Sequence, residues 1–146
     1  MCASQVIAAV LPTKNGMTPI AEVETAIKCF EAVEWSSSGY PLAGGDAGEP
    51  ADAGWVKFGL RPSKLGWRTL EFLAWVCTDM AQAGERLRFF PTAPPPYLNT
   101  PGECLSFVLE CYPKDGDQDQ RFRKVAEFIT WCHKERWAEC RGRLKA

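Results

Sequence analysis

The feature that most constrains this fold is a short motif that occurs twice. The pentapeptide EFLAW at residues 71–75 returns almost unchanged as EFITW at residues 127–131. Each copy lies in a helix-like segment that follows an alternating, strand-like run ending in proline, at Pro62 and Pro113. A third run of this kind ends at Pro12, so the three prolines stand 50 and 51 residues apart. This spacing is typical of repeated supersecondary units, but the general resemblance of strand–loop–helix units also explains it.

Hydrophobic periodicity predicts the order of the elements along the chain. Apolar or alternating runs predict strands over residues 4–11, 35–42, 55–60, 86–90 and 104–112. A period of 3.6 predicts helices over about 18–33, 65–83 and 119–140, the first capped by Thr18 and the second closed by Gly84. This β-α-β-β-α-β-β-α order predicts a single α+β domain over residues 1–146. Its first six elements match a ferredoxin-like split βαβ pattern with a mainly antiparallel sheet and helices on one face.

Length and cysteine usage narrow the class of protein. A chain of 146 residues buries enough surface to fold without disulfides or metals. Its seven cysteines are an odd number, and Cys29, Cys77, Cys111 and Cys132 fall within apolar patterns. Reduced cysteines behave in this way as small core residues. Together with the lack of a basic, signal-like N-terminus and of any apolar run near ~20 residues, this predicts a cytoplasmic protein without a membrane segment.

The sequence offers few candidates for catalysis or metal binding. His133 is the only histidine, and its neighbour Cys132 would point about 100° away on a helix, which favours a structural histidine over a Cys–His pair. Asp115, Asp117 and Asp119 resemble the start of a calcium loop, but the glycine and the final glutamate of such a loop are missing, so helix capping is the better interpretation. No Cys-x2-Cys pair or phosphate-binding loop occurs. We therefore expect no metal and no cofactor.

The most informative residues are aromatic pairs in the two copies of the motif. Phe72/Trp75 and Phe128/Trp131 either form a seam between two helices or lie partly exposed, where aromatic residues often dominate binding. The stripe Leu70, Leu73, Ala74, Cys77, Met80 and Ala81 is expected to face the core. The opposite side carries Asp79, and a carboxylate near aromatic residues suits a surface that meets a basic partner. We therefore predict that Phe72, Trp75 and Asp79 face a partner and that Phe128 and Trp131 are more buried.

Two further regions suggest partners. The loop around residues 41–53 is long and acidic, and its Asp46, Glu49 and Asp52 could meet a basic cleft. One face of the predicted sheet carries aromatic residues interleaved with cations. These are Trp55, Phe90 and Tyr112 with Lys57, Arg86 and Arg88. Such a face would suit stacked bases and phosphates, unless a helix or the proline-rich loop at residues 91–101 covers it.

The leading functional hypothesis is a non-catalytic, protein-binding protein. It would be a small inhibitor or immunity protein that neutralises a toxin or another enzyme by covering its active site. A single-stranded nucleic-acid-binding module is the alternative, although a net charge of −1 and a pI of about 5.9 argue against nucleic acid as the partner. A cysteine-dependent enzyme using His133 is the third hypothesis.

Overall fold

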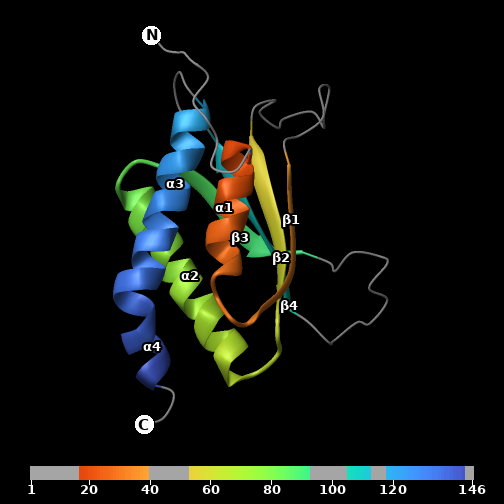
Figure 1. Cartoon of the computed structure of the whole chain (residues 1–146), viewed down its shortest axis with the longest axis vertical. Helices are drawn as coiled ribbons and strands as arrows, with labels where there is room; N and C mark the ends of the chain where they lie inside the picture. The colour runs from red at the N-terminus through yellow and green to blue at the C-terminus, as the bar shows by residue number, and fades with distance from the viewer. Residues whose placement is uncertain (1–16, 40–52, 93–104, 113–117, 144–146) are drawn as a thin grey trace.

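The computed structural model describes residues 17–39, 53–92, 105–112 and 118–143. Within these ranges the chain forms an α+β structure in which a four-stranded antiparallel sheet is covered on one face by helices (Figure 1). The general α+β class and the antiparallel sheet are therefore confirmed. The strand predicted over residues 4–11 and the acidic loop with Asp46, Glu49 and Asp52 lie outside the described residues.

Helix α1 (Pro19–Lys28) begins where the sequence predicts. The Thr18 hydroxyl oxygen accepts a hydrogen bond from the amide of Ala21 at 3.3 Å, and proline occupies the first helical position. The helix ends at Lys28, five residues before the predicted end. A turn follows, in which the amide of Val33 donates to the carbonyl oxygen of Phe30 at 3.1 Å and leads the chain directly into the first strand.

Strands β1 (Val33–Gly39) and β2 (Gly54–Leu60) pair in antiparallel fashion. β2 places Val56, Phe58 and Leu60 in the core, as its alternating pattern predicts. β1 faces the helices with serines instead of apolar residues. The hydroxyl groups of Ser36 and Ser38 each donate to the Glu24 carboxylate on α1 at 2.6 Å, so hydrogen bonds hold this edge of the sheet to α1.

Helix α2 (Lys64–Gln82) is the longest element and ends in a glycine cap. Gly84 has a φ of +101°, its amide donates to the Ala81 carbonyl, and the amide of Glu85 reaches the Met80 carbonyl at 3.0 Å. The chain then forms β3 (Arg86–Pro91) and β4 (Leu105–Tyr112). It continues as one long C-terminal helix made of α3 (Gln118–Cys132), the π-helical turn η3 (His133–Trp137) and α4 (Ala138–Gly142).

The strand order is β1-β2-β4-β3, with β4 antiparallel to both of its neighbours. A ferredoxin-like fold would instead place its N-terminal strand between its third and fourth strands, which correspond here to β2 and β3. That position is occupied by β4. The ferredoxin-like order is therefore not confirmed. The described chain consists of two α-β-β units whose last strands meet at the centre of the sheet, followed by the C-terminal helix.

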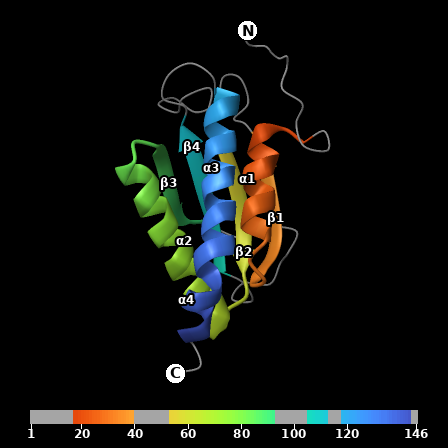
Figure 2. The same ribbon diagram turned by 60° about the vertical axis from the view of Figure 1, so that its left-hand side comes forward.

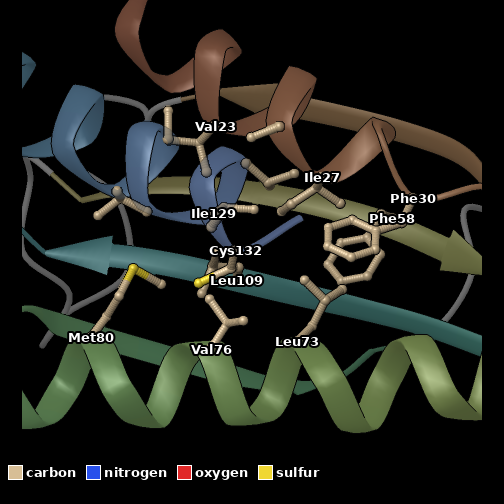
Figure 3. Packing of buried hydrophobic residues seen from close by; sticks show 14 of the residues in the cluster. Val23, Ile27, Phe30, Phe58, Leu73, Val76, Met80, Leu109, Ile129 and Cys132 are labelled. Carbon is tan, nitrogen blue, oxygen red and sulfur yellow. The ribbon is translucent and has the colours of Figure 1, made fainter. Parts of the chain in front are cut away.

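Figure 2 shows the sheet and the helical layer beside it, and the hydrophobic core fills the space between them (Figure 3). α1 and α3 pack closely against one another, and α2 covers the other half of the sheet. The predicted buried stripe of the C-terminal helix is confirmed, since all its members are buried: Phe122, Val125, Ala126, Ile129 and Cys132. Phe30 lies at the end of the core near the C-terminus, with its ring centroid 5.8 Å from that of Phe72 and 5.3 Å from that of Trp137.

The predicted orientation of α2 about its own axis is wrong by about one residue. Phe72, Leu73, Val76 and Met80 are buried, whereas Ala74 and Ala81 are exposed. The larger side chains of Phe72 and Val76 bury more apolar surface than the two alanines would, which explains the rotation.

Candidate functional site: a groove beside Trp75

Three tryptophans are exposed on the helical layer, which is half of the six in the chain. Trp67 and Trp75 on α2 are each 58% exposed, and Trp131 on α3 is 46% exposed. Single exposed apolar residues are common on proteins, but large aromatic side chains gathered on one layer often mark a binding surface. Trp67 and Trp75 stand eight residues apart on α2, a little over two helical turns, so their side chains leave the helix about 80° apart around its axis.

Trp75 borders a groove of about 770 Å³ between α2 and the C-terminal helix. We call this groove, with the residues that line it, the Trp75 groove. Figure 1 shows α2 and α4 side by side at the end of the molecule where the groove lies. One wall comes from α2 and the other from η3 and α4. The lining residues are Arg68, Glu71, Phe72, Ala74, Trp75, Thr78, Arg136, Glu139, Cys140 and Arg143.

The π-helical turn and the hydrogen bonds of Trp137 and Arg141 to Glu31, which we call the Glu31 clamp, position the second wall. In a π-helical turn an extra residue widens the helix, and such turns are frequent at functional sites. Here the wide turn lets Cys132 and Trp137, five residues apart, both reach the core. Trp137 then donates a hydrogen bond from Nε1 to the Glu31 carboxylate at 3.2 Å. One turn later Arg141 Nη1 contacts both oxygens of the same carboxylate, at 2.8 and 2.7 Å.

Charged side chains line both walls of the Trp75 groove. Arg68 Nη1 lies 2.5 Å from the Glu71 carboxylate, and Arg143 Nη2 lies 3.0 Å from that of Glu139. Arg136 stacks on the Trp131 ring at 4.9 Å and approaches Asp79 at 3.8 Å. Among the described residues, Arg68 Nε is a buried side-chain nitrogen without a hydrogen-bond partner. The groove therefore combines an indole, a few small side chains and several guanidinium groups.

The three residues of α2 that the sequence predicts to face a partner differ in their exposure and contacts. Trp75 is exposed at the groove. Phe72 is 3% exposed and packs against Phe30 and Trp137, so the expectation that it faces outward is wrong, although one edge of it lines the groove. Asp79 is partly exposed and already engaged by Arg136.

The second aromatic pair also divides between surface and interior. Phe128 is partly buried and stacks on Trp131 with a centroid distance of 6.1 Å. Trp131 is less exposed than Trp75, but at 46% it is far from buried. It lines a separate cleft between α1 and α3, together with Thr25, Cys29 and Ala126. The two aromatic pairs therefore do not form a seam between α2 and α3; Phe72 instead contacts Trp137 of the C-terminal helix.

Among the residues that the structure describes, the cysteines and the histidine show no arrangement that would activate a thiol. Burial raises the pKa of Cys77 to about 12 and raises the pKa of Cys111 further, and it also raises the pKa values of Cys132 and Cys140. A catalytic thiol needs the opposite shift. His133 is partly buried and meets the Phe30 ring edge-on at 4.7 Å, which is a structural contact. Cys29 is exposed, contrary to its apolar sequence pattern.

The sheet face turned away from the helices carries the predicted mixture of aromatic and basic residues. Lys57 lies over the Trp55 ring at 5.6 Å, and Arg88 lies over the Phe90 ring at 5.0 Å. Arg88 also pairs with Glu110 at 3.4 Å, and the Tyr112 hydroxyl donates to the same carboxylate. These aromatic residues are all partly buried, and Val108 between them is buried. This face therefore offers less open ring surface than the sequence suggests.

The parts of the chain that the structure describes hold no cluster of three or more His, Cys, Asp or Glu residues arranged to bind a metal ion. No helix in those parts is both long enough and apolar enough to cross a membrane.

Sequence reasoning missed the residues that the C-terminal helix contributes to the groove, among them Glu139, Cys140 and Arg143. Their proximity to α2 depends on the π-helical turn and on the Glu31 clamp, and neither leaves a local pattern. Trp67 was a missed signal that the sequence did contain, because a large aromatic residue stands there outside the apolar stripe predicted for the helix.

Comparison with known proteins gave no match to any family model, to any curated protein or to any solved structure. The site must therefore be interpreted from its own geometry.

Proposed function

We propose that this chain is a non-catalytic, protein-binding protein that binds its partner through the Trp75 groove. The observation that carries the proposal is the exposed Trp75 indole beside a groove of about 770 Å³ whose walls belong to two packed helices. Tryptophan and arginine are the residues most enriched among those that dominate binding energy at protein interfaces. Both line this groove, and rigid helices on both sides hold them in place.

The form of this function that we propose is inhibition. A small protein that covers the active site of a toxin or another enzyme needs a preformed surface but no catalytic groups of its own. The raised thiol pKa values and the structural packing of His133 favour this role over the cysteine-dependent enzyme. Asp46, Glu49 and Asp52 remain proposed contributors to the contact.

Affinity capture from the native host tests the proposal. The tagged chain is expected to retain one protein in stoichiometric amount, and Trp75→Ala is expected to lose it, with binding weakened by at least ~2 kcal/mol. Trp131→Phe is the matched control, because it replaces a similarly exposed indole in a different cleft and keeps a ring on which Arg136 can stack. If the captured protein is an enzyme, its activity should be lower in the complex. Equal retention by wild type and Trp75→Ala would remove the groove from the proposal.

The nucleic-acid-binding alternative depends on the outer sheet face, where Lys57, Arg86 and Arg88 are exposed. It is less well supported because Lys57 and Arg88 already lie over the rings of Trp55 and Phe90, on which bases would stack. A labelled oligothymidine decides between the two. Salt-dependent binding that is lost in Lys57→Glu would favour the alternative, since phosphate contacts release counterions.

A further inference from the structure

We propose that the occupant of the Trp75 groove is an acidic amphipathic helix presented by the partner protein. This inference rests on the proposed function and deepens it by naming the chemistry of the partner. It follows from the shape of the groove, from the charge on its walls and from the hydrogen-bond donors that its arginines leave free.

The shape of the groove suits a helix. On α2 the lining residues run from Arg68 to Thr78, which corresponds to about 15 Å or three helical turns. The apolar residues of this wall lie in its middle turn, where Ala74 and Trp75 are exposed and the buried Phe72 contributes an edge. An amphipathic helix lying in such a groove would place apolar side chains at positions i and i+3 or i+4 against this turn and polar side chains against the charged ends, which is a common mode of peptide recognition.

The charge of the groove walls indicates which charge the entering segment of the partner carries. Arg68, Arg136 and Arg143 line the groove against two carboxylates, Glu71 and Glu139. An adjoining pocket around Trp67 shares Arg68 and Glu71 with the groove and adds Lys64. With Asp79, which pairs with Arg136, four cations stand against three carboxylates, so this surface carries a surplus of one positive charge, although the whole chain carries −1. An incoming helix with carboxylates beside its apolar stripe complements it.

The arginines can still accept a carboxylate although each has an ion pair within the chain. A guanidinium group has five N–H donors, and each of these pairs engages a single nitrogen. The ion pairs of Arg136 and Arg143 are also weak, since both arginines are exposed and exposed ion pairs contribute little. Arg143 is 70% exposed, so it can turn toward a ligand. Arg136 contacts Asp79 only at 3.8 Å and stacks on the Trp131 ring, so it can donate its remaining N–H groups from that position.

This inference reverses the charge expected for the partner from sequence. Asp79 and the acidic loop suggested a basic partner. In the structure the Asp79 carboxylate is paired with Arg136, and the groove beside Trp75 is lined by three arginines and two glutamates. The segment that enters the groove is therefore acidic, whatever the charge of the rest of the partner.

Two matched peptides test the inference with the full-length chain. Each is a labelled amphipathic helix of about 18 residues, long enough to fold in part alone. The two share the same leucine stripe and differ only in carrying glutamate or lysine on its flanks. By fluorescence anisotropy at low ionic strength, the glutamate peptide is expected to bind at least about tenfold more tightly than the lysine peptide. At about 1 M salt, where charges are screened beyond ~3 Å, this preference should largely disappear.

Variants connect the preference to the groove. Arg143→Glu is expected to weaken binding of the glutamate peptide about fivefold or more and to strengthen binding of the lysine peptide. Because Arg143 is so exposed, this change does not threaten the fold. Lys134→Glu makes the same charge change on the exposed surface of the C-terminal helix outside the groove, and it should leave the preference intact. Trp75→Ala should weaken the binding of both peptides.

Three results would overturn the inference. They are equal or tighter binding of the lysine peptide, a glutamate preference that survives Arg143→Glu, and no binding of either peptide. None of these touches the proposed function. A partner captured by wild type and lost in Trp75→Ala but unaffected by Arg143→Glu would support the function and reject the acidic helix.

Discussion

At the residue scale, Glu31 connects the C-terminal helix to the turn after α1. Its carboxylate accepts from Arg141 and from Trp137, and these hydrogen bonds hold the pKa of Glu31 below its usual value. Because the folded pKa is the lower one, the stabilisation is fully present above the pKa of the unfolded chain. It is lost as the pH falls through the folded pKa.

Glu31→Gln should therefore unfold at lower urea concentration than wild type at neutral pH, and the difference should shrink at acidic pH, as wild-type Glu31 becomes protonated through its lowered pKa. The side chain is about half exposed, so the effect will be modest. Urea midpoints at the two pH values measure it. The control variant Glu135→Gln removes an exposed carboxylate of the C-terminal helix and leaves the contact between Glu31 and Arg141 in place. Its difference in urea midpoint from wild type should not shrink at acidic pH. A constant difference between wild type and Glu31→Gln at both pH values would contradict the prediction.

The cysteines give a second prediction at this scale. Cys29 is exposed, whereas burial raises the pKa of Cys77 to about 12 and that of Cys111 further still. Since the thiolate is the reactive form, a thiol reagent at neutral pH should modify Cys29 first among these three. Cys77 and Cys111 should react only on unfolding. Peptide mapping after timed labelling measures each site separately, and rapid modification of Cys111 in the folded chain would be the opposite result.

At the scale of elements, the start of α2 depends on a close approach between backbones. Gly66 is buried, and a Cβ atom added there would overlap the carbonyl oxygen of Arg61, which cannot move as a side chain could. We expect Gly66→Ala to destabilise the protein by about 1–3 kcal/mol or more. Gly142→Ala is the matched control. Open space surrounds its added methyl group, and alanine favours the helix by about 1 kcal/mol. Denaturant unfolding of both variants provides the measurement, and a stable Gly66→Ala would show that α2 can shift.

The repeated pentapeptide also has its explanation at this scale. In both copies the middle residue is buried, as Leu73 and Ile129, and the final tryptophan is exposed, as Trp75 and Trp131. The repeat thus encodes one amphipathic orientation of a helix over a sheet. Local periodicity, of 3.6 residues in helices and of two in strands, is why the sequence predicted the helices and most strands well. It could not decide which flank of an all-round apolar helix faces inward, and for that reason Phe72 was misplaced.

At the scale of the whole molecule, the limits of sequence reasoning are those of long-range pairing. Each strand was recognisable by itself, yet nothing local specifies that β4 inserts between β2 and β3. The candidate site has the same character. Trp75 could be singled out from sequence, but Arg143 could not, because its wall of the groove is held by a contact between Glu31 and Arg141, 110 residues apart.

The final prediction compares Trp137 and Trp75. We expect the first to be needed for folding and the second for binding. Trp137 is buried at the junction of α1, α2 and the C-terminal helix, where it contacts Phe30 and Phe72. Trp137→Ala should cost about 3–5 kcal/mol, a large part of a typical stability of 5–15 kcal/mol. Trp75→Ala removes an indole that is mostly in solvent, so it should change stability by less than about 1 kcal/mol.

Urea unfolding curves of the two variants, with binding measured on whatever remains folded, give the comparison. In Trp137→Ala, binding of the partner protein should weaken mainly because less of the chain is folded. Any further loss would come from a looser packing of the C-terminal helix, which forms one wall of the Trp75 groove. Trp75→Ala should stay folded and still lose binding. If Trp75→Ala instead costs several kcal/mol of stability, Trp75 supports the fold, and the groove beside it is part of the packing of α2 against the C-terminal helix and not a surface kept open for a partner.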